Sequence, residues 1–206
     1  AAAREVSFKG SPFVNMLGKY GNFEVDSNAD GLADGWILGI GTASLDESSI
    51  AGNYSQKITA AIDGNLAIYK DIEAVANHVL FISLYIKSSA SRTFRPTFYS
   101  YGSWSNAINI MSNYTSTTSF VRRFTKWTNI IGNLRISFNG VGFLTGENIN
   151  FDGIQLIDLT ERGALDPVRQ AKYGVANWED LTEAQLEAEI SYFDGYLSAN
   201  TELAET

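Results

Sequence analysis

Hydrophobic and polar residues alternate along most of the chain between residues 23 and 159. In residues 80–87, Leu, Ile, Leu and Ile occupy every second position, and Phe, Ser, Tyr and Lys lie between them. Residues 134–138 repeat this arrangement. Because successive side chains of a strand point to opposite faces, the pattern predicts strands with one face packed inward. Further predicted strands are 54–59, 66–70, 94–101, 107–111, 120–127 and 151–159.

Clusters of Gly, Asn, Ser and Asp separate these short strands, which is typical of antiparallel sheets joined by turns. The predicted fold is therefore all-β, and the strands suit one β-sandwich. A chain of 206 residues is long enough to bury one core of this kind. We expect the sandwich to span residues 17–160, with an N-terminal extension at 1–16 and a helical C-terminal extension at 161–206.

The predicted helices lie in the C-terminal extension, where the alternation stops. Asp166 is a suitable N-cap, Pro167 fits the first helical position, and Gly174 is suited to end a short helix. A second helix begins after Thr182, which forms a capping box with Gln185. Its apolar positions at helical spacing are Leu186, Ile190 and Phe193, before Asp194-Gly195, where we expect this helix to end.

The formal net charge is −8, from 15 Lys and Arg against 23 Asp and Glu. This balance argues against nonspecific binding to nucleic acid or to anionic membranes, because both require clustered basic residues. Arg122, Arg123 and Lys126 form a small basic cluster. We expect it to be a solvated strand face, with binding of a phosphate-bearing wall polymer as the alternative. A neutral polar partner fits the composition better.

The chain contains no cysteine, so disulfides and thiolate metal sites are excluded. No continuous apolar stretch is long enough to cross a bilayer, and we therefore expect no membrane insertion. We also expect no signal peptide, because residues 1–10 lack an apolar core. If the protein acts outside a cell, we expect that it leaves the cell by a route other than a signal peptide, or that it has lost a leader sequence.

Oxygen-bearing side chains recur at alternate positions in the turn that precedes Trp36. Gly31 follows the third of them, so the loop can curl and direct several oxygens at one hard cation, and Ca²⁺ is the cation that this pattern favours. Ile37 stands where an EF-hand loop carries its bidentate glutamate, which lowers the expected affinity. The alternative is a tight turn whose side chains cap backbone groups. The residues concerned are Asp26, Asn28, Asp30 and Asp34, with Glu24 just before them.

Short segments in a fixed order resemble the jelly-roll carbohydrate-binding modules. They are Asn22-Phe23-Glu24 with the acidic turn and Asp34-Gly35-Trp36, then residues 53–58, 80–87 and 150–156. The run 156–161, followed by an acidic helix and Tyr192-Phe193-Asp194-Gly195, is similar to the C-terminal signature of such modules in bacteriophage tail and baseplate proteins. The resemblance covers residues 17–196.

This resemblance implies a jelly-roll β-sandwich with a structural Ca²⁺ near the first and last strands. Acidic side chains and backbone carbonyls hold such an ion, and Glu24 and Asp152 stand at the matching positions. Which of the carboxylates bind the metal stays open at this point. The candidate metal ligands are Glu24, Asp26, Asn28, Asp30, Asp34 and Asp152.

A saccharide-binding face is predicted from the alternation in residues 94–101. Proteins bind sugars by stacking CH groups on aromatic rings, while hydroxyls bond to amides, carboxylates and Arg. Arg95, Tyr99 and Tyr101 share one face of this strand, and we expect the polar face of the preceding strand to extend it. Packing of the rings in the core or in a subunit interface is the alternative. The predicted ligand-binding residues are Tyr85, Arg95, Tyr99, Tyr101, Trp104, Asn109 and Arg135.

No catalytic function is predicted. A glycosidase requires two facing carboxylates, and the sequence offers no recognisable pair of this kind. No serine lies in a nucleophile elbow. The resemblance instead implies a non-catalytic module that binds a saccharide of the host cell surface as part of a phage tail or baseplate, and hence a virion protein that acts outside the cell.

The expected partners are other tail or baseplate proteins and copies of the same chain. Weak binding at one site would gain from several copies, so we expect a homo-oligomer, trimeric by resemblance. Two alternatives remain open: a structural head or spacer of a trimeric tail fibre, and an accessory module of a secreted glycoside hydrolase.

Overall fold

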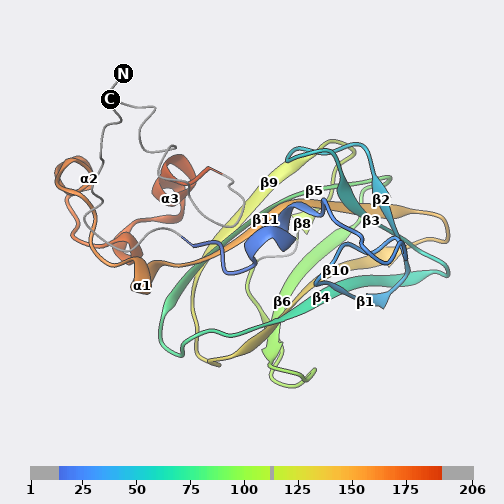
Figure 1. Ribbon diagram of the computed structural model, residues 1–206, viewed down its shortest axis with the longest axis horizontal. Helices are drawn as coiled ribbons and strands as arrows, with labels where there is room; N and C mark the ends of the chain where they lie inside the picture. The colour runs from blue at the N-terminus through green and yellow to red at the C-terminus, as the bar shows by residue number, and fades with distance from the viewer. Residues whose placement is uncertain (1–13, 112–113, 192–206) are drawn as a thin grey trace.

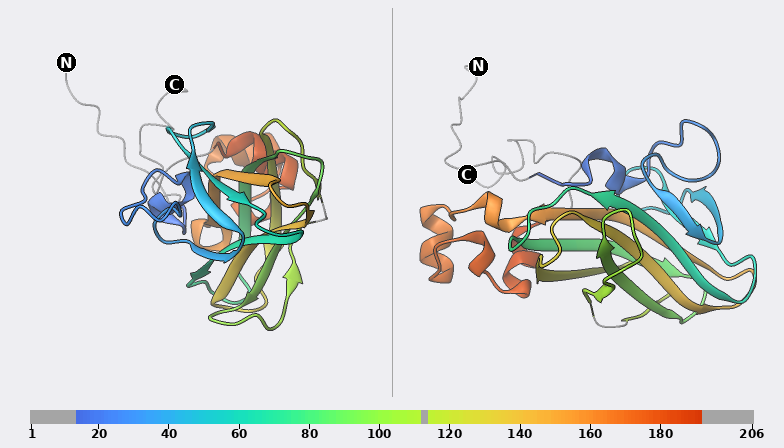
Figure 2. Two further views of the ribbon diagram at one scale, coloured as in Figure 1. Left: turned by 90° about the vertical axis from the view of Figure 1, so that its right-hand side faces the viewer. Right: turned by 90° about the horizontal axis from the view of Figure 1, so that it is seen from below.

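The computed structural model describes residues 14–111 and 114–191. Two antiparallel sheets lie face to face, and the short helices of the C-terminal extension gather at one end of them (Figures 1 and 2). The all-β sandwich with a helical extension is therefore confirmed. Within the described residues, no helix combines the length and the apolar character needed to cross a membrane.

Sheet 1 has the strand order β1-β4-β10-β6-β7, with β8 also paired to β6, and sheet 2 has the order β2-β3-β11-β5-β9. The strands of sheet 1 are β1 (Ile37–Ile40), β4 (Gly64–Ile72), β6 (Thr93–Ser100), β7 (Ile108–Asn109), β8 (Tyr114–Thr115) and β10 (Leu134–Phe143). Those of sheet 2 are β2 (Thr42–Asp46), β3 (Ser55–Thr59), β5 (Val79–Ser88), β9 (Val121–Thr128) and β11 (Asn148–Asp158).

The alternation pattern predicts the long strands well and the short ones poorly. Each predicted segment contains a strand, although β7 covers only two residues of the predicted range 107–111. The pattern does not predict β1, β2 or β8, which are four, five and two residues long. Strands of this length carry too few positions for a period of two to stand out.

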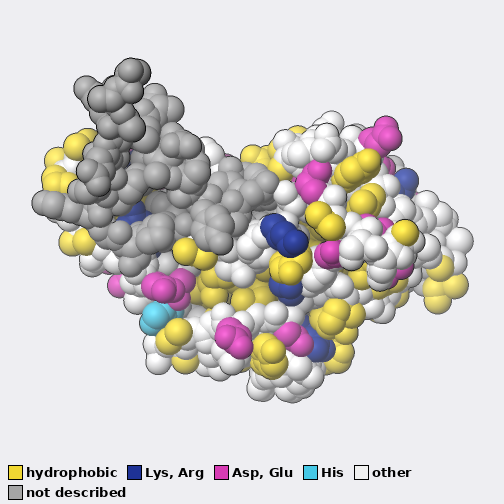
Figure 3. All heavy atoms as spheres, in the orientation of Figure 1, with side chains coloured by type: hydrophobic (Ala, Val, Ile, Leu, Met, Phe, Trp, Pro, Cys, Tyr) yellow, Lys and Arg dark blue, Asp and Glu magenta, His cyan; other side chains and the backbone are white. Residues whose placement is uncertain are grey.

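The core lies between the inward rows of the two sheets. The hydrophobic residues at alternate positions of 80–86 in β5 and 134–138 in β10 are buried. Phe138 of sheet 1 contacts Phe151 of sheet 2 and also Trp36, with ring centroids 5.8 and 5.7 Å apart. Figure 3 shows hydrophobic, acidic and basic side chains interspersed on the visible face of the molecule, as expected of a surface that faces solvent.

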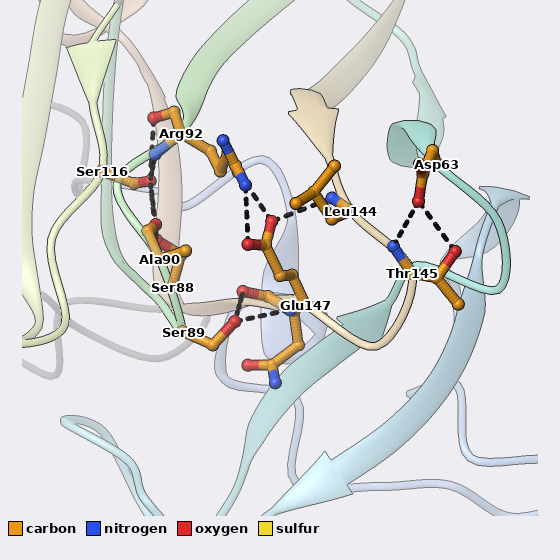
Figure 4. Close-up of polar contacts among 10 residues, drawn as sticks. Asp63, Ser88, Ser89, Ala90, Arg92, Ser116, Leu144, Thr145 and Glu147 are labelled. Atoms are coloured by element: carbon orange, nitrogen blue, oxygen red, sulfur yellow. Dashed lines mark hydrogen bonds and ion pairs between the residues drawn. The ribbon is translucent and has the colours of Figure 1, made fainter.

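Side chains connect the loops at the end of the sandwich away from the helices (Figure 4). Nε and Nη2 of Arg92 donate to the carboxylate of Glu147 at 2.6 and 2.7 Å, which joins the β5–β6 loop to the β10–β11 loop. Asp63 accepts hydrogen bonds from the backbone N–H and the hydroxyl of Thr145, which adds the β3–β4 loop. Contacts outside the sheets therefore also hold these loops together.

The first described residues pack along β11. Asn15 donates from Nδ2 to the Ile154 carbonyl at 3.2 Å and accepts from the Leu156 N–H at 3.1 Å. The Met16 N–H donates to the Leu156 carbonyl at 2.8 Å. A short 3₁₀ helix, η1 (Gly18–Asn22), follows. Asn15 and Met16, which the prediction assigns to the N-terminal extension, thus lie on the sandwich.

The helical extension comprises α1 (Leu159–Arg162), α2 (Pro167–Tyr173), the 3₁₀ helix η2 (Trp178–Asp180) and α3 (Glu183–Glu189). The predicted caps are confirmed. Asp166 accepts two backbone hydrogen bonds at the start of α2, Gly174 ends it with φ 71°, and Thr182 and Gln185 form the capping box of α3. However, α3 ends at Glu189, earlier than predicted. The predicted apolar position Phe193 and the end at Asp194-Gly195 lie outside the described residues.

The extension packs on the outer face of sheet 2. Its buried residues form a second apolar cluster with Phe81 and Ile157 of the sheet. Arg122 of β9 donates to the Ile190 carbonyl at 2.6 Å, and Lys126 donates to the Leu181 carbonyl at 2.6 Å. The expected solvated basic face is therefore wrong for these two residues, because their charges bind backbone carbonyls of the extension.

Glu189 joins α3 to α2. Its carboxylate accepts hydrogen bonds from Lys172 Nζ and Arg169 Nε, both at 2.7 Å, and from the Tyr173 hydroxyl. Burial alone raises the pKa of Glu189, but the hydrogen bonds from Lys172, Tyr173 and Arg169 outweigh it and lower the pKa to about 2. Because the pKa is lower in the folded state, ionised Glu189 stabilises the fold above its ordinary pKa of 4.5, and this stabilisation is lost as the pH falls towards 2.

Glu189→Gln should lower the free energy of unfolding by about 2 kcal/mol at pH 7, since it removes the charge from these hydrogen bonds. The difference from wild type should shrink at about pH 3, where wild-type stabilisation is already declining. Denaturant titrations at both pH values measure this. Glu187→Gln, at an exposed position of the same helix, is the control, and an equal loss in both variants would contradict the assigned role of Glu189.

Candidate functional site

The outer face of sheet 1 brings together polar and aromatic residues from neighbouring strands. Strand pairing places Asp71 of β4, Arg135 of β10 and Tyr99 of β6 in one row across the sheet. The next row contains Tyr69, Ser137 and Thr97, followed by Asn109 of β7. These rows face away from the core, because they alternate with Ile68 and Ile72 of β4, Ile136 of β10 and Phe98 of β6, which belong to the buried cluster.

An ion pair lies at the centre of this face. Nε and Nη2 of Arg135 donate to the two carboxylate oxygens of Asp71 at 2.7 and 3.0 Å. The hydrogen bonds from Arg135 lower the pKa of Asp71, burial partly opposes this, and the charge of Arg135 and the backbone amide of Gly102 lower it further. The guanidinium also lies over two rings, with Cζ 4.3 Å from the Tyr69 centroid and 4.8 Å from the Trp104 centroid.

Trp104 stands on the loop after β6 and returns over the sheet. Its ring makes edge contacts with Tyr69 and Tyr99, at centroid distances of 4.9 and 5.1 Å. The Trp104 side chain is nevertheless 50% exposed. Hydrogen bonds within the loop fix its shape: the Ser100 N–H donates to the Ser105 carbonyl at 3.0 Å. The ring is therefore both open to solvent and held in one orientation.

A strip of amide and hydroxyl groups continues from these rings along β6 and β10. Asn139 Nδ2 donates to the Arg95 carbonyl at 3.1 Å and to the Thr97 hydroxyl at 3.3 Å. The Thr97 hydroxyl donates to Asn109 Oδ1 at 3.1 Å, and the Ser137 hydroxyl donates to Asn139 Oδ1 at 3.0 Å. Thr97 and Ser137 are buried and orient the amides, so the polar groups of this strip that a ligand can reach are those of Asn109 and Asn139. The face thus combines aromatic rings, a guanidinium–carboxylate pair and side-chain amides, and aromatic rings and amides are groups that bind sugar rings and hydroxyls.

Most of the predicted ligand-binding residues lie on or beside this face. Tyr101 follows the end of β6 and is 51% exposed. The residues that the structure brings together are Arg95, Tyr99, Trp104, Asn109 and Arg135, and Tyr101 stands beside them at the end of β6.

The prediction that Tyr85 extends the same face is wrong. Tyr85 belongs to β5, which lies in sheet 2, and it is paired there with Arg122. The chain crosses from one sheet to the other between β5 and β6, so consecutive strands present their outer rows on opposite sides. Sequence reasoning also missed Tyr69 and Asp71. Both residues lie an odd number of positions from the buried Ile68 of the same strand, and this alternation indicates that they lie on the outer face.

The acidic turn has the hydrogen bonds of a tight turn. Asp26 accepts from the Gly31 N–H and Asp30 accepts from the Leu32 N–H, both at 2.8 Å. Asn28 and Asp34 are used in the same way: Asn28 accepts from the Asp30 N–H, and Asp34 accepts from the N–H and the hydroxyl of Ser27. Within the described residues, no three His, Cys, Asp or Glu side chains are grouped so that they could hold a metal ion.

Asp152 is the most deeply buried carboxylate among the candidate metal ligands. Its exposed fraction is 0%. Oδ2 accepts hydrogen bonds from the Ile50 and Ala51 N–H groups at 2.5 and 2.9 Å, and Oδ1 accepts from the Gly153 N–H at 2.7 Å. Burial raises the pKa of Asp152 to about 6, the three backbone N–H groups oppose this shift, and the negative charge of Glu24 adds to it.

Glu24 binds the same loop as Asp152. Its Oε1 accepts from the Asn53 and Tyr54 N–H groups at 2.7 and 2.9 Å. Gly52 allows this approach, because its φ is 74° and a Cβ there would lie 2.2 Å from Glu24 Oε1. Two mutually repelling carboxylates therefore meet at one loop. Carboxylate oxygens are ligands that suit a hard divalent cation such as Ca²⁺, and its charge would offset the repulsion between them.

The sequence matches no protein-family model and no curated protein. Similar folds occur among solved structures. The CBM22-1 xylan-binding domain from Paenibacillus barcinonensis is 13% identical, with a TM-score of 0.51 over 74% of this chain and 97% of that chain. The tandem CBM22-1–CBM22-2 domain from the same organism is 14% identical, with a TM-score of 0.52 over 75% and 47%.

A third similar structure is the enzymatically active domain of tailspike protein 4 from bacteriophage CBA120. It is 13% identical, with a TM-score of 0.51 over 69% of this chain and 21% of that chain. At these identities the similarity concerns the fold. The chain therefore has the jelly-roll β-sandwich fold found in carbohydrate-binding modules, which confirms the predicted fold class.

Arg135→Lys should lower the free energy of unfolding by about 2 kcal/mol, since a lysine cannot make the bidentate bond to Asp71 or stack on two rings. Arg95→Lys is the matched control on the same face and should change stability by less than about 0.5 kcal/mol, because its guanidinium has no ion pair among the described residues. Chemical denaturation compares the two. Equal effects would show that the ion pair does not organise this face.

Proposed function

We propose that this protein is a non-catalytic glycan-binding module whose binding surface is the outer face of sheet 1. The position of Trp104 supports this proposal most strongly: its ring is half-exposed, yet Tyr69, Tyr99 and Arg135 fix its orientation. A ring held in this way can stack on the CH face of a sugar with little further loss of side-chain entropy. The neighbouring amides of Asn109 and Asn139 would bind the sugar hydroxyls.

The ionisation of Asp71 supports the absence of catalysis at this face. Glycoside hydrolysis requires one carboxyl group as a proton donor and a second as base or nucleophile. Asp71 is bound to Arg135 by two hydrogen bonds and its pKa is lowered, so it stays ionised at neutral pH. In this ion pair Asp71 is suited to hold Arg135 against the aromatic rings, and it is not suited to donate a proton.

We also propose that Ca²⁺ binds between Glu24 and Asp152 and braces the loop between β2 and β3. The burial of Asp152 and the repulsion from Glu24 support this assignment, because a divalent cation would offset both. The carboxylates at both places accept backbone N–H groups. The acidic turn is the less favoured place because its side chains are exposed or only partly buried, whereas Asp152 is fully buried. The ion would have a structural role and no part in sugar binding.

For the biological setting, we propose an adhesion device on a phage tail or baseplate that binds a saccharide of the host surface. The resemblance of several sequence segments to phage modules supports this setting, and the similarity to a phage tailspike is compatible with it. A homo-oligomer, by resemblance a trimer, would convert weak single-site binding into useful avidity.

Trp104→Ala, Tyr99→Ala and Tyr101→Ala should each weaken glycan binding, and Trp104→Ala should do so about tenfold or more, since it removes a stacking surface. A glycan and cell-wall binding screen, followed by titration of the strongest ligand, measures the effect. Tyr85→Ala, on the outer face of sheet 2, is the matched control and should bind like wild type. Thermal melting of all four variants separates loss of binding from loss of fold.

Three outcomes would contradict the proposal. A stable oligomer that binds no glycan would favour the structural head of a tail fibre. Hydrolysis of an oligosaccharide by the purified chain would favour an enzyme. Loss of binding in Tyr85→Ala with retention in Trp104→Ala would move the site to sheet 2.

Removal of calcium with EGTA should lower the melting temperature by several degrees, and added Ca²⁺ should restore it, because a ligand bound only by the folded state stabilises that state. Asp152→Asn should lose this calcium response. Asp30→Asn, in the acidic turn, is the control and should keep it. A melting curve that EGTA leaves unchanged would remove calcium from the proposal.

A further inference from the structure

Arg95 carries a positive charge on the outer face of sheet 1 that no described residue neutralises. Its backbone carbonyl accepts a hydrogen bond from Asn139, but its guanidinium has no hydrogen bond or ion pair within residues 14–111 and 114–191. Its Nε is buried and has no acceptor there. The two terminal Nη groups are not buried in this way and have no partner among the described residues, so a ligand oxyanion that reached them would gain charge-assisted hydrogen bonds.

Other arginines among the described residues bind carboxylates, which the guanidinium of Arg95 does not. Arg92, Arg135 and Arg169 each bind carboxylates through short hydrogen bonds from the guanidinium. On the face that carries Arg95, the carboxylate of Asp71 is already bound to Arg135. Arg95 therefore leaves this face with an uncompensated positive charge, although the whole chain has a net charge of −8.

The spacing of Arg95 from the aromatic residues defines the size of a ligand. Arg95 and Tyr99 lie four positions apart on β6, so both point outward and stand about 13 Å apart along the strand. The Tyr99 ring contacts Trp104. Thr97 lies between Arg95 and Tyr99 but is buried, and its hydroxyl is bonded to Asn109 and Asn139. A ligand that reaches both ends is an oligosaccharide and not a single sugar.

We propose that Arg95 binds an oxyanion carried by an acidic glycan, at a position a few sugar units from the ring stacked on Trp104. This inference rests on the proposed function, and it adds the class of ligand. The planar guanidinium suits a carboxylate, such as that of a uronic acid, because both can form two parallel hydrogen bonds. A phosphate group in a wall polymer offers the same chemistry, and the experiment distinguishes the two sources.

The test uses a panel of glycans. Each uronic acid oligosaccharide in it is paired with its carboxyl-reduced, neutral form. Phosphate-bearing wall polymers complete the panel. The wild-type protein should bind an acidic member about tenfold more tightly than its neutral partner. Arg95→Gln should abolish this preference, so that the acidic and neutral members of each pair bind with equal affinity. Arg95→Lys should keep part of it, because the charge remains and the planar fork is lost.

Lys57→Gln removes a positive charge from sheet 2 and is the control, which should keep the wild-type preference. A preference for phosphate polymers over uronates, lost in Arg95→Gln, would identify phosphate as the source of the oxyanion. Equal binding of acidic and neutral forms, still abolished by Trp104→Ala, would overturn this inference alone. Failure of every glycan to bind would overturn the proposed function and this inference with it.

Discussion

The structure depends on the burial of one hydrophobic row from each sheet against the other. The alternate residues of 80–86 in β5 and 134–138 in β10 are withdrawn from water, and burial of each large side chain contributes about 2 kcal/mol. The same alternation turns the intervening residues outward. Packing of the core thereby decides which side chains are available for contacts outside it. The outer face of sheet 1 carries Arg135 and its rings, whereas part of the outer face of sheet 2 packs against the C-terminal extension.

Sequence alone predicted the features that depend on neighbours along the chain. The strand at 80–87 and the caps at Asp166 and Thr182 are local patterns, and the structure contains them. Alternation shows which residues share a face of one strand, but it does not show which strands become neighbours. For this reason the pattern puts Tyr85 on the wrong side, and it does not connect Tyr69 with Arg135, although these two lie on adjacent strands.

The candidate metal residues illustrate a different limit of sequence reasoning. Asp, Asn and Gly build a tight turn and a calcium loop by the same means, because both direct side-chain oxygens towards the centre of a loop. In the acidic turn around Asp30, those oxygens accept the backbone N–H groups of the turn itself. Glu24 and Asp152 are 128 positions apart in the chain, and only folding brings them to one loop. Resemblance to a family selected this pair, and spacing within the sequence did not.

The attachment of both described chain ends to sheet 2 has a mechanical consequence. Asn15 is bonded to β11, and the carbonyl of Ile190 is bonded to Arg122 of β9. A pulling force applied at Asn15 or Ile190 would enter the domain through sheet 2. Sheet 1 would receive that load indirectly, through the connecting loops and the side chains packed between the layers, so its outer surface lies one layer away from both points of attachment.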